Sequence, residues 1–324
     1  MHESIEKKGE GILLKHMEKK YPSNVNFSKD EIKKIIQELK KQGWLEVPKK
    51  WADKDGGGGE YIQHDHFHVK VNPEKIGDLG DYELKTHRSV GNSLITLGSI
   101  DPKNEERGSM LHPLLLNYGF PYKNGDTAKF VCRDKKNGKE CKHTKYNYTN
   151  GLCYPDNEVS LGMDVCGKKV FESPQNKWGF YLEINREKKR VFVHFDHTRT
   201  DEKEKYQNWL LTVKARNNGL QDLGEKYSLP FDEIEQAAKE KIHKMVFIKY
   251  LEKREDGKYL ISIEEAYFLE EFSFENYLKA LENGQVMYEF RLHGNQERIS
   301  KNHGTGFRMF EKNFPVIYGK KEEI

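Results

Sequence analysis

The sequence predicts a mixed α/β (α+β) protein in which helices alternate with short strands and hairpins. Two patterns indicate this class: apolar residues at helical spacing behind recognisable N-caps, and short apolar runs on either side of tight turns. The chain has 324 residues, of which 35% are hydrophobic, so it can bury one large core or two lobes. We expect an N-terminal helical segment over residues 1–50, a first lobe over residues 51–200 and a second lobe over residues 201–324.

The composition excludes a membrane-spanning helix, because no run of about eighteen apolar residues occurs. The first eight residues carry charges where a secretory signal needs an apolar core, so we expect a cytoplasmic protein. The formal net charge is only +3, from 55 basic and 52 acidic residues. Bulk charge therefore argues for neither nucleic acid nor any other partner.

The four cysteines are Cys132, Cys141, Cys153 and Cys166, and their spacing is irregular. In a chain this long they do not form a disulfide framework. They fall in one segment, but the paired knuckles of a structural zinc site are missing. We predict reduced thiols.

The N-terminal region predicts two helices and a strand. Residues 4–20 form a short amphipathic pattern. Ser28 and Glu31 have the spacing of a capping box, which opens a helix that Gly43 closes, and residues 44–47 have the pattern of a strand. Such a unit suits a small DNA-reading module, although packing against the first lobe is the simpler interpretation.

Four consecutive glycines, Gly56–Gly59, predict a loop that is either a flexible linker or a place where backbone approaches a ligand closely. His64, His66 and His68 follow at alternate positions. In an extended segment all three would face one side and a metal site would be conceivable, whereas an exposed strand or helix face is the simpler interpretation.

The stretch from Asp78 to Arg88 carries the clearest chemical pattern, an acidic residue, a short turn and then Glu-Leu-Lys. In a strand Glu83 and Lys85 share one face, and the glycine-containing turn can bring Asp78 beside Glu83. Two carboxylates and a backbone carbonyl form an oxygen site suited to Mg²⁺, and Lys85 could position or activate a water molecule. This pattern is typical of metal-dependent phosphodiester cleavage, but Glu-x-Lys also occurs on ordinary solvated strands.

The remaining chain predicts further strands and helices in order. They are a strand or helix start at 93–97, hairpins at 146–163 and 178–195, a charged surface loop at 198–205, a helix at 231–243, an Asp-Gly hairpin at 245–263, a helix at 273–281 and a strand at 286–291. Residues 302–310 place polar donors between glycines ahead of Arg308, which suits an element that enters a DNA groove. Side chains that only satisfy one another would produce the same pattern.

Three blocks, in this order, resemble the MvaI/BcnI-type restriction endonucleases, relatives of the mismatch-repair nickase MutH. The blocks are Asp78–Leu97, Tyr148–Leu152, and Tyr288–His293 followed by Asn302–Arg308. The resemblance spans roughly residues 28–319, and the third block is the most specific.

The resemblance implies a PD-(D/E)XK nuclease core, with a mixed central sheet flanked by helices and two lobes that form a cleft for duplex DNA. It also implies Mg²⁺-dependent hydrolysis that leaves 5′-phosphates, by a monomer that nicks each strand in turn at a short pseudosymmetric site with CC and GG around a central pair. Asp78, Glu83 and Lys85 would form the active site, with Asp78 and Glu83 holding the metal. The candidate DNA-binding residues are Arg88, Glu289, Arg291, His293, Asn302, His303, Thr305 and Arg308.

The resemblance has departures and competitors. In the family a helix with a glutamate follows the glycine-rich segment, whereas here Gly56–Gly59 precede Glu60 and the histidines, so Glu60 receives no role. Residues 123–145 and the first 25 or so have no counterpart. A restriction enzyme would need a DNA methyltransferase encoded nearby. The alternatives are a MutH-like repair nickase, a DNA-binding protein without catalysis, and an unrelated α/β protein with a coincidental Glu-Leu-Lys.

Overall fold

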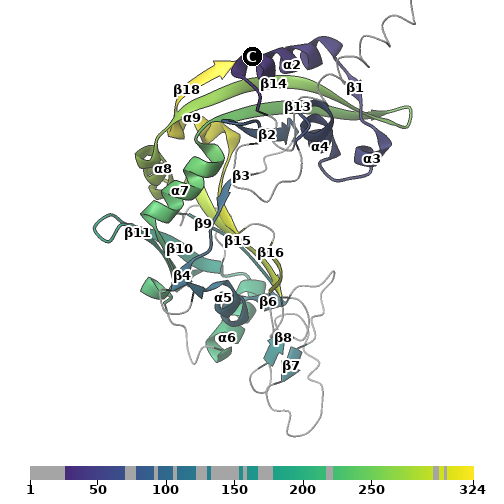
Figure 1. The fold of residues 1–324 in the computed structure, drawn as a ribbon. Coiled ribbons are helices and arrows are strands. Elements are labelled where there is room, and N and C mark those ends of the chain that lie inside the picture. The colour runs from purple at the N-terminus through teal and green to yellow at the C-terminus, as the bar shows by residue number, and fades with distance from the viewer. Residues whose placement is uncertain are drawn as a thin grey trace, which may run out of the picture. The chain divides into compact units, whose positions relative to one another are not determined.

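The computed structural model describes residues 26–69, 78–90, 94–104, 108–121, 130–132, 153–155, 159–166, 178–216, 222–294, 299–302 and 305–324. The chain forms two compact units, each assembled from segments that are distant in the sequence (Figure 1). Unit 1 contains Met1–Ser93, Lys239–Phe272 and Tyr318–Ile324, and unit 2 contains Leu94–Ala238 and Ser273–Ile317. Both units combine sheets with helices, so the predicted mixed fold class is confirmed.

Unit 1 is built on a five-stranded mixed sheet. Its strands are β1 (Leu45–Glu46), β2 (Glu83–Arg88), β13 (Met245–Glu255), β14 (Lys258–Phe272) and β18 (Tyr318–Glu323). Their order is β1-β14-β13-β2, and β18 also pairs with β14. β13 and β14 are antiparallel, whereas β2 runs parallel to β13, with Glu83 opposite Met245 and Lys85 opposite Phe247. The strand pair that carries the Glu-Leu-Lys motif is therefore formed by segments about 160 residues apart.

The predicted Asp-Gly hairpin is confirmed and is longer than expected. Asp256 and Gly257 join β13 to β14 with φ angles of 49° and 74°. Positive φ at both central residues is the geometry of a tight hairpin turn, which Asp-Gly favours.

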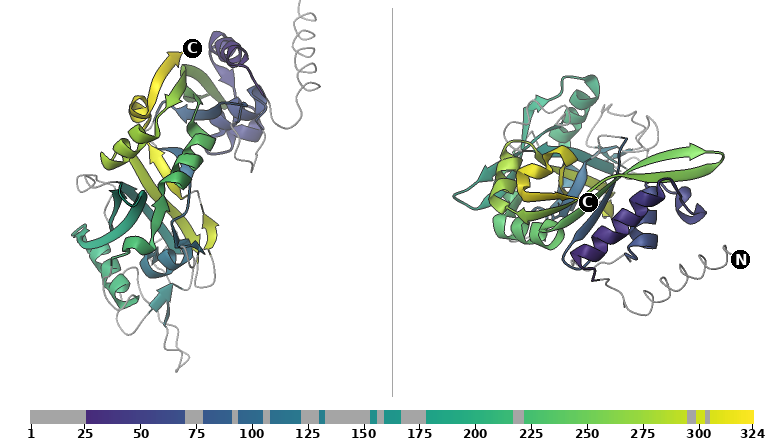
Figure 2. Two further views of the ribbon diagram at one scale, coloured as in Figure 1. Left: turned by 60° about the vertical axis from the view of Figure 1, so that its left-hand side comes forward. Right: turned by 90° about the horizontal axis from the view of Figure 1, so that it is seen from above.

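The predicted capping box is confirmed. The hydroxyl of Ser28 accepts the N–H of Glu31 at 3.3 Å, and the carboxylate of Glu31 accepts the N–H of Ser28 at 2.9 Å. Gly43, at a φ of 72°, ends the helix. Buried Ile32 and Ile36 join the core of unit 1, and the helix lies along β14 (Figures 1 and 2). Among its described residues, unit 1 contains the helices α2 (Lys29–Gln42), α3 (Lys49–Ala52), α4 (Gly57–Tyr61) and the π-helical turn η1 (Ile62–His66).

The prediction of a loop at Gly56–Gly59 is wrong, because three of these glycines form the buried start of α4. A Cβ on Gly57 would lie 1.9 Å from the carbonyl oxygen of Trp51, and a Cβ on Gly59 would lie 2.6 Å from Oγ1 of Thr86. The missing side chains let α4 contact α3 and β2 at backbone distance, which outweighs the low helix propensity of glycine.

Of the alternatives for His64, His66 and His68, the helical one holds for the first two, which lie in η1, so the extended arrangement does not apply. His64 pairs with Glu60 at 3.0 Å and its ring stacks on Trp51 at 5.0 Å. Burial lowers the pKa of His66, and the charge of Asp65 only partly opposes this effect. The three histidines therefore do not share one side, while Glu60 does stand on a helix directly after the glycines.

The described residues of unit 2 form three sheets. The six-stranded sheet has the order β3-β17-β15-β9-β6 with β16 also paired to β15, the five-stranded sheet has the order β10-β11-β12-β4-β5, and β7 pairs with β8. The strands are β3 (Ile95–Ser99), β4 (Lys103–Asn104), β5 (Gly108–Ser109), β6 (Phe120–Pro121), β7 (Phe130–Cys132), β8 (Cys153–Pro155), β9 (Val159–Cys166), β10 (Trp178–Asn185), β11 (Arg190–Thr200), β12 (Ser228–Pro230), β15 (Val286–Gly294), β16 (Ile299–Asn302) and β17 (Gly306–Met309).

The helices of unit 2 border these sheets. They are α5 (Leu111–Tyr118), α6 (Glu204–Arg216), η4 (Gly224–Lys226), α7 (Phe231–Ile242), which continues into unit 1, α8 (Phe274–Glu282), η5 (Glu311–Asn313) and α9 (Phe314–Ile317). Fully buried Trp209 donates its indole N–H to the carbonyl of Tyr118 at 2.8 Å and packs against Phe180 and Phe195. This aromatic cluster ties α5 and α6 to the β10–β11 hairpin.

Most predicted elements of unit 2 are confirmed, namely the strand alternative at 93–97, the hairpin at 178–195, the helices at 231–243 and 273–281 and the strand at 286–291. The surface loop predicted at 198–205 is wrong, since β11 continues to Thr200 and α6 begins at Glu204. The predicted helix at 4–20 and residues 146–152 of the predicted hairpin lie outside the described residues.

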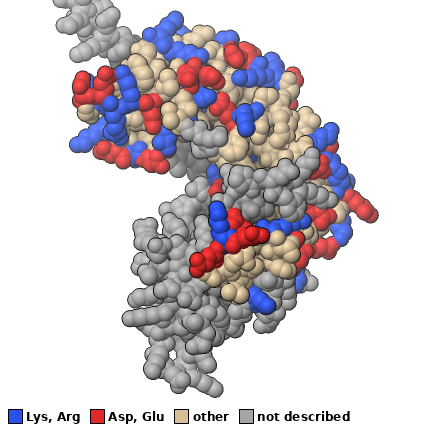
Figure 3. Space-filling view, turned by 180° about the vertical axis from the view of Figure 1, so that it is seen from behind, with Lys and Arg blue, Asp and Glu red and all other residues tan. Residues whose placement is uncertain are grey.

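The described surface mixes the two charge signs. On the face shown in Figure 3, Lys and Arg side chains lie among Asp and Glu side chains wherever the residues are described. Within the described ranges no helix is long and apolar enough to cross a membrane.

Candidate active site

Strand β2 places the motif residues on two faces of the sheet. Leu84, only 1% exposed, points into the core of unit 1. Glu83 and Lys85 therefore share the opposite face, as the period of a strand requires. Their side chains meet, with Nζ of Lys85 2.5 Å from Oε1 of Glu83.

The turn before β2 folds Asp78 back onto the strand. The N–H of Leu84 donates to Oδ2 of Asp78 at 3.3 Å, and the N–H of Leu79 donates to the carbonyl of Tyr82 at 2.9 Å. Gly80 has a φ of 84°, and a Cβ there would lie 2.2 Å from Oδ1 of Asn26. The turn thus needs glycine, and it brings the carboxylate of Asp78 to the start of the Glu-Leu-Lys strand.

Glu83 is a buried carboxylate whose two oxygens differ. It is 4% exposed, and its Oε1 accepts the hydrogen bond from Lys85. Its Oε2 has no hydrogen-bond partner among the described residues, and the ammonium of Lys241 lies 3.8 Å away. A buried carboxylate oxygen without a hydrogen bond is costly, so this oxygen is suited to accept a further ligand.

Lys241 is a site residue that the sequence pattern does not reveal. It lies near the end of α7, and β13, which follows α7, pairs in parallel with β2. One rule could identify it. When a helix leads into a strand, a cation at the end of the helix lies near the start of the strand that pairs with it in parallel. The sequence does not show that β2 and β13 are neighbours, so this signal appears only in the fold.

The pKa of Asp78 is raised. Burial is the main cause and the charge of Glu83 adds to it, while Lys85, the N–H of Leu84 and Lys241 act in the opposite direction. The two carboxylates therefore repel each other in a poorly hydrated place, and the lysines only partly compensate. A buried carboxylate with a raised pKa beside a second carboxylate is typical of functional sites.

These residues fit a hard divalent cation such as Mg²⁺. The donor set is oxygen only, and the free Oε2 of Glu83 together with Asp78 offers two carboxylates at the start of one strand. In the described part of the chain no three His, Cys, Asp or Glu side chains group as a metal site. Two carboxylates suffice for Mg²⁺, which usually keeps several waters, whereas a structural zinc site needs more protein ligands.

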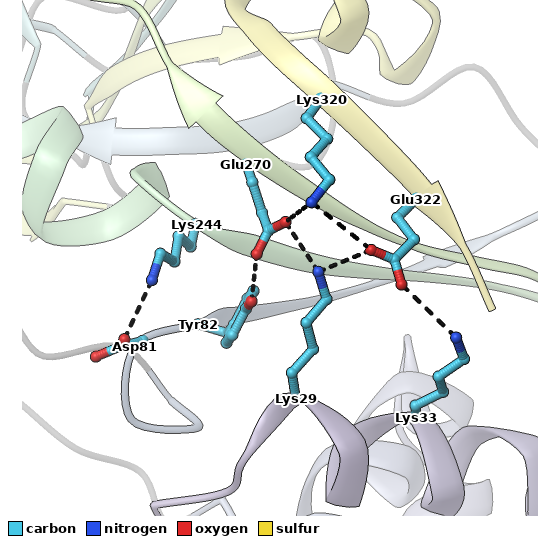
Figure 4. A network of polar contacts seen from close by, with 8 residues as sticks. All are labelled: Lys29, Lys33, Asp81, Tyr82, Lys244, Glu270, Lys320 and Glu322. Atoms are coloured by element: carbon cyan, nitrogen blue, oxygen red, sulfur yellow. Dashed lines mark hydrogen bonds and ion pairs between the residues drawn. The ribbon is translucent and has the colours of Figure 1, made fainter.

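A second polar cluster includes Tyr82, the residue directly before Glu83. We call it the Glu270 network, formed by Lys29, Tyr82, Glu270, Lys320 and Glu322 (Figure 4). The hydroxyl of Tyr82 donates to Glu270 at 2.5 Å, and the ammonium of Lys29 lies 2.8 Å from both Glu270 and Glu322. Lys320 lies 3.1 Å from Glu270. The network joins α2, β14 and β18 to the turn that carries the acidic residues.

Arg88 lies on the face of β2 opposite Glu83 and Lys85. Its guanidinium pairs with Asp55 at 3.0 Å and with Glu252 at 3.6 Å. These acidic partners hold Arg88 beside the segment between α3 and α4 and beside β13.

In unit 2 the structure brings together Glu289 on β15 and Arg308 on β17. Glu289 lies opposite Gly306 in the register, and its carboxylate forms an ion pair with Arg308, which is 7% exposed. Thr305, three residues before Arg308, is fully buried. The side chains of Arg291, His293, Asn302 and His303 lie outside the described part of the structure.

Comparisons with known proteins identify a family and a similar fold. The model of the MvaI/BcnI restriction endonuclease family matches residues 32–318. The fold is similar to that of a restriction endonuclease MvaI–cognate DNA substrate complex, with a TM-score of 0.62 and 17% sequence identity over 92% of this chain and 99% of that chain. MvaI in the absence of DNA matches over the same shares at 17% identity with a TM-score of 0.44.

No curated protein sequence matches the chain. The family match covers most of the sequence, and the shared fold is supported independently by the structural similarity. The chain belongs to the MvaI/BcnI restriction endonuclease family.

Proposed function

We propose that this protein is a type II restriction endonuclease that hydrolyses phosphodiester bonds of double-stranded DNA at a short pseudosymmetric site, with Mg²⁺ as cofactor. The observation that carries the proposal is the buried carboxylate of Glu83, which lies beside Asp78 and Lys85 and has one oxygen without a hydrogen bond within the described ranges. This arrangement belongs to a PD-(D/E)XK core, with Asp78 as the leading acid and Glu83-Leu84-Lys85 as the strand motif.

Each residue has a defined task in this proposal. Asp78 and Glu83 hold the cation, and Lys85 orients the attacking water and keeps Glu83 in place through its hydrogen bond. When bound, Mg²⁺ stabilises the charge of the phosphorane and makes the water a stronger nucleophile. The oxygen of water forms a bond to phosphorus and releases a proton to solvent, while the bond to the 3′-oxygen breaks and that oxygen takes up a proton from solvent. The products are a 5′-phosphate and a 3′-hydroxyl.

Recognition falls to unit 2 in this proposal. The ion pair between Glu289 and Arg308 fixes the guanidinium on β17, which supports a role of Arg308 in reading a base pair. The other candidates for DNA contacts in unit 2 are Arg291, His293, Asn302, His303 and Thr305, and Arg88 is a further candidate in unit 1. The similar structure of MvaI is a complex with its cognate DNA substrate, which supports duplex DNA as the ligand here.

The biological setting follows from the same proposal. A monomer would nick each strand in turn at a site such as CCNGG, in the cytoplasm. A DNA methyltransferase encoded nearby would protect the host genome.

The direct test is incubation of the purified protein with unmethylated phage DNA and Mg²⁺, with EDTA as the control. We expect discrete, metal-dependent fragments, whose mapped ends give the site. Nicked circles without linear product would favour a MutH-like nickase instead. A shifted band without cleavage would favour a DNA-binding protein that has no catalytic activity.

A further inference from the structure

Lys241 is a second lysine at the acid pair, and the Asp…Glu-x-Lys motif does not include it. Its ammonium lies 3.8 Å from Oε2 of Glu83, on the side of the carboxylate that Lys85 does not occupy. The side chains of Lys241 and Lys85 are 35% and 25% exposed. Both cations are therefore accessible from solvent while the carboxylate between them is buried.

The geometry of Lys241 differs from that of a structural ion pair. Lys85 reaches Glu83 at 2.5 Å and Lys29 reaches Glu270 at 2.8 Å, both within hydrogen-bond distance. Lys241 stays beyond that distance, and no residue that the structure describes forms a hydrogen bond with Oε2 of Glu83. Lys241 thus places a positive charge at the site without using the oxygen that a cation would need.

The balance of charges at the site also supports a role of Lys241 in the reaction. Asp78 and Glu83 contribute two negative charges, and Lys85 and Lys241 balance them. A divalent cation on the two carboxylates would leave both ammonium groups without a counter-charge. A phosphodiester supplies one negative charge, and its pentacovalent transition state carries two, so the ammonium groups find their partner there.

We propose that Lys241 is a second catalytic cation, which moves from Glu83 to the scissile phosphate when metal and DNA are bound. This inference rests on the proposed nuclease function. Lys241 transfers no proton in this scheme, since its charge alone stabilises the phosphorane and the departing 3′-oxygen.

Lys241→Met tests the proposal, and Lys244→Met is its matched control. Lys244 lies three residues further along, is 32% exposed and pairs with exposed Asp81 at 3.2 Å. We expect Lys241→Met to lower the single-turnover cleavage rate at saturating DNA by at least about 100-fold, whereas Lys244→Met stays within about threefold of the wild type. Lys241→Arg keeps the positive charge, so it should cleave DNA at least about tenfold faster than Lys241→Met.

Metal binding without DNA supplies a readout that is independent of activity. Removing a positive charge next to the carboxylates should tighten Mn²⁺ binding by about threefold or more, measured from the electron paramagnetic resonance signal of free Mn²⁺. Unchanged or weaker Mn²⁺ binding by Lys241→Met, or cleavage as fast as that of Lys244→Met, would overturn the proposal. If the wild type cuts no DNA, the proposed function fails, and the Mn²⁺ comparison still decides whether Lys241 neighbours a cation site.

Discussion

Tyr82 belongs to the Glu270 network, and the next residue, Glu83, belongs to the candidate active site. Both are clusters of lysine and carboxylate side chains, but they differ in how completely their charges are paired. In the Glu270 network, burial alone would raise the pKa of Glu270, but hydrogen bonds from Lys29, Tyr82 and Lys320 outweigh it and lower the pKa to about 2. At the site, burial and Glu83 raise the pKa of Asp78.

The difference shows how the same residue types serve two purposes. The carboxylate of Glu270 has a donor on both oxygens and therefore stabilises the fold. In the acid pair of Asp78 and Glu83, Oε2 of Glu83 has no hydrogen bond from any described residue, so the pair keeps the capacity to bind a cation and costs stability when no cation is bound. The first cluster holds the turn at Tyr82 that positions the second.

The largest expected effect is the loss of DNA cleavage when a residue of the candidate active site is replaced. Asp78→Asn and Lys85→Met should each lower the single-turnover cleavage rate by at least about 10³-fold, because they remove a metal ligand and the residue that orients the water. DNA binding, measured by gel shift in Ca²⁺, should change little. Asp81→Asn removes a carboxylate that is 75% exposed and serves as the control, with cleavage close to the wild-type rate. Undiminished cutting by Asp78→Asn would refute the assignment of the site.

The next effect tests the Glu270 network by stability. Glu270→Gln should lower the free energy of unfolding at pH 7 by about 2 kcal/mol, because Lys29 and Lys320 lose their shared counter-charge. The pKa of Glu270 lies below its ordinary value in the folded protein, so its stabilisation is present above pH 4.5 and is lost as the pH falls toward 2.

Urea unfolding at several pH values measures this loss. The wild type and Glu270→Gln should converge as the pH falls through that window. A constant difference between them down to pH 2 would show that the charge of Glu270 is not the cause.

A smaller effect is expected at the residue that connects the clusters. Tyr82→Phe keeps the ring against Phe268 and removes the hydrogen bond to Glu270. The hydroxyl is bonded to a charged group, so its loss should cost about 1.5 kcal/mol, measured by urea unfolding. Cleavage should stay within about threefold of the wild type, whereas a collapse of activity would mean that the hydroxyl belongs to the site.

The smallest effect has the opposite sign. Asp78→Asn should raise the Tm of the metal-free protein by a few degrees, because it removes the repulsion with Glu83 and can still accept the N–H of Leu84. The pKa of Asp78 is raised in the fold, so the gain should be present at neutral pH and vanish as the pH falls below 3.8. Scanning calorimetry in EDTA measures it, and a lower Tm at pH 7 would contradict a strained acid pair.

Local signals explain what the sequence could predict. The Ser28 and Glu31 capping box, the Asp256-Gly257 turn and the faces of Glu83 and Lys85 depend on residues within a few positions of one another. The alternation of side chains along a strand and the residue preferences of turns and helix caps therefore sufficed to predict these features.

Long-range packing explains the rest. Gly57 and Gly59 form a helix only because Trp51 and Thr86 occupy the space of a side chain, and the alternation of the histidines has no meaning in a π-helical turn. Lys241 approaches Glu83 because β2 pairs with β13, and no residue close to either strand in the sequence predicts this pairing.

Binding of Mn²⁺ to the metal-free protein tests the contrast between the clusters most directly. Electron paramagnetic resonance of free Mn²⁺ would compare the wild type with Glu83→Gln and Glu270→Gln, at a temperature where all three remain folded. We expect Glu83→Gln to weaken binding by at least about tenfold and Glu270→Gln to leave it unchanged. Equal binding by the wild type and Glu83→Gln would contradict the view that the incompletely paired acids form the catalytic metal site.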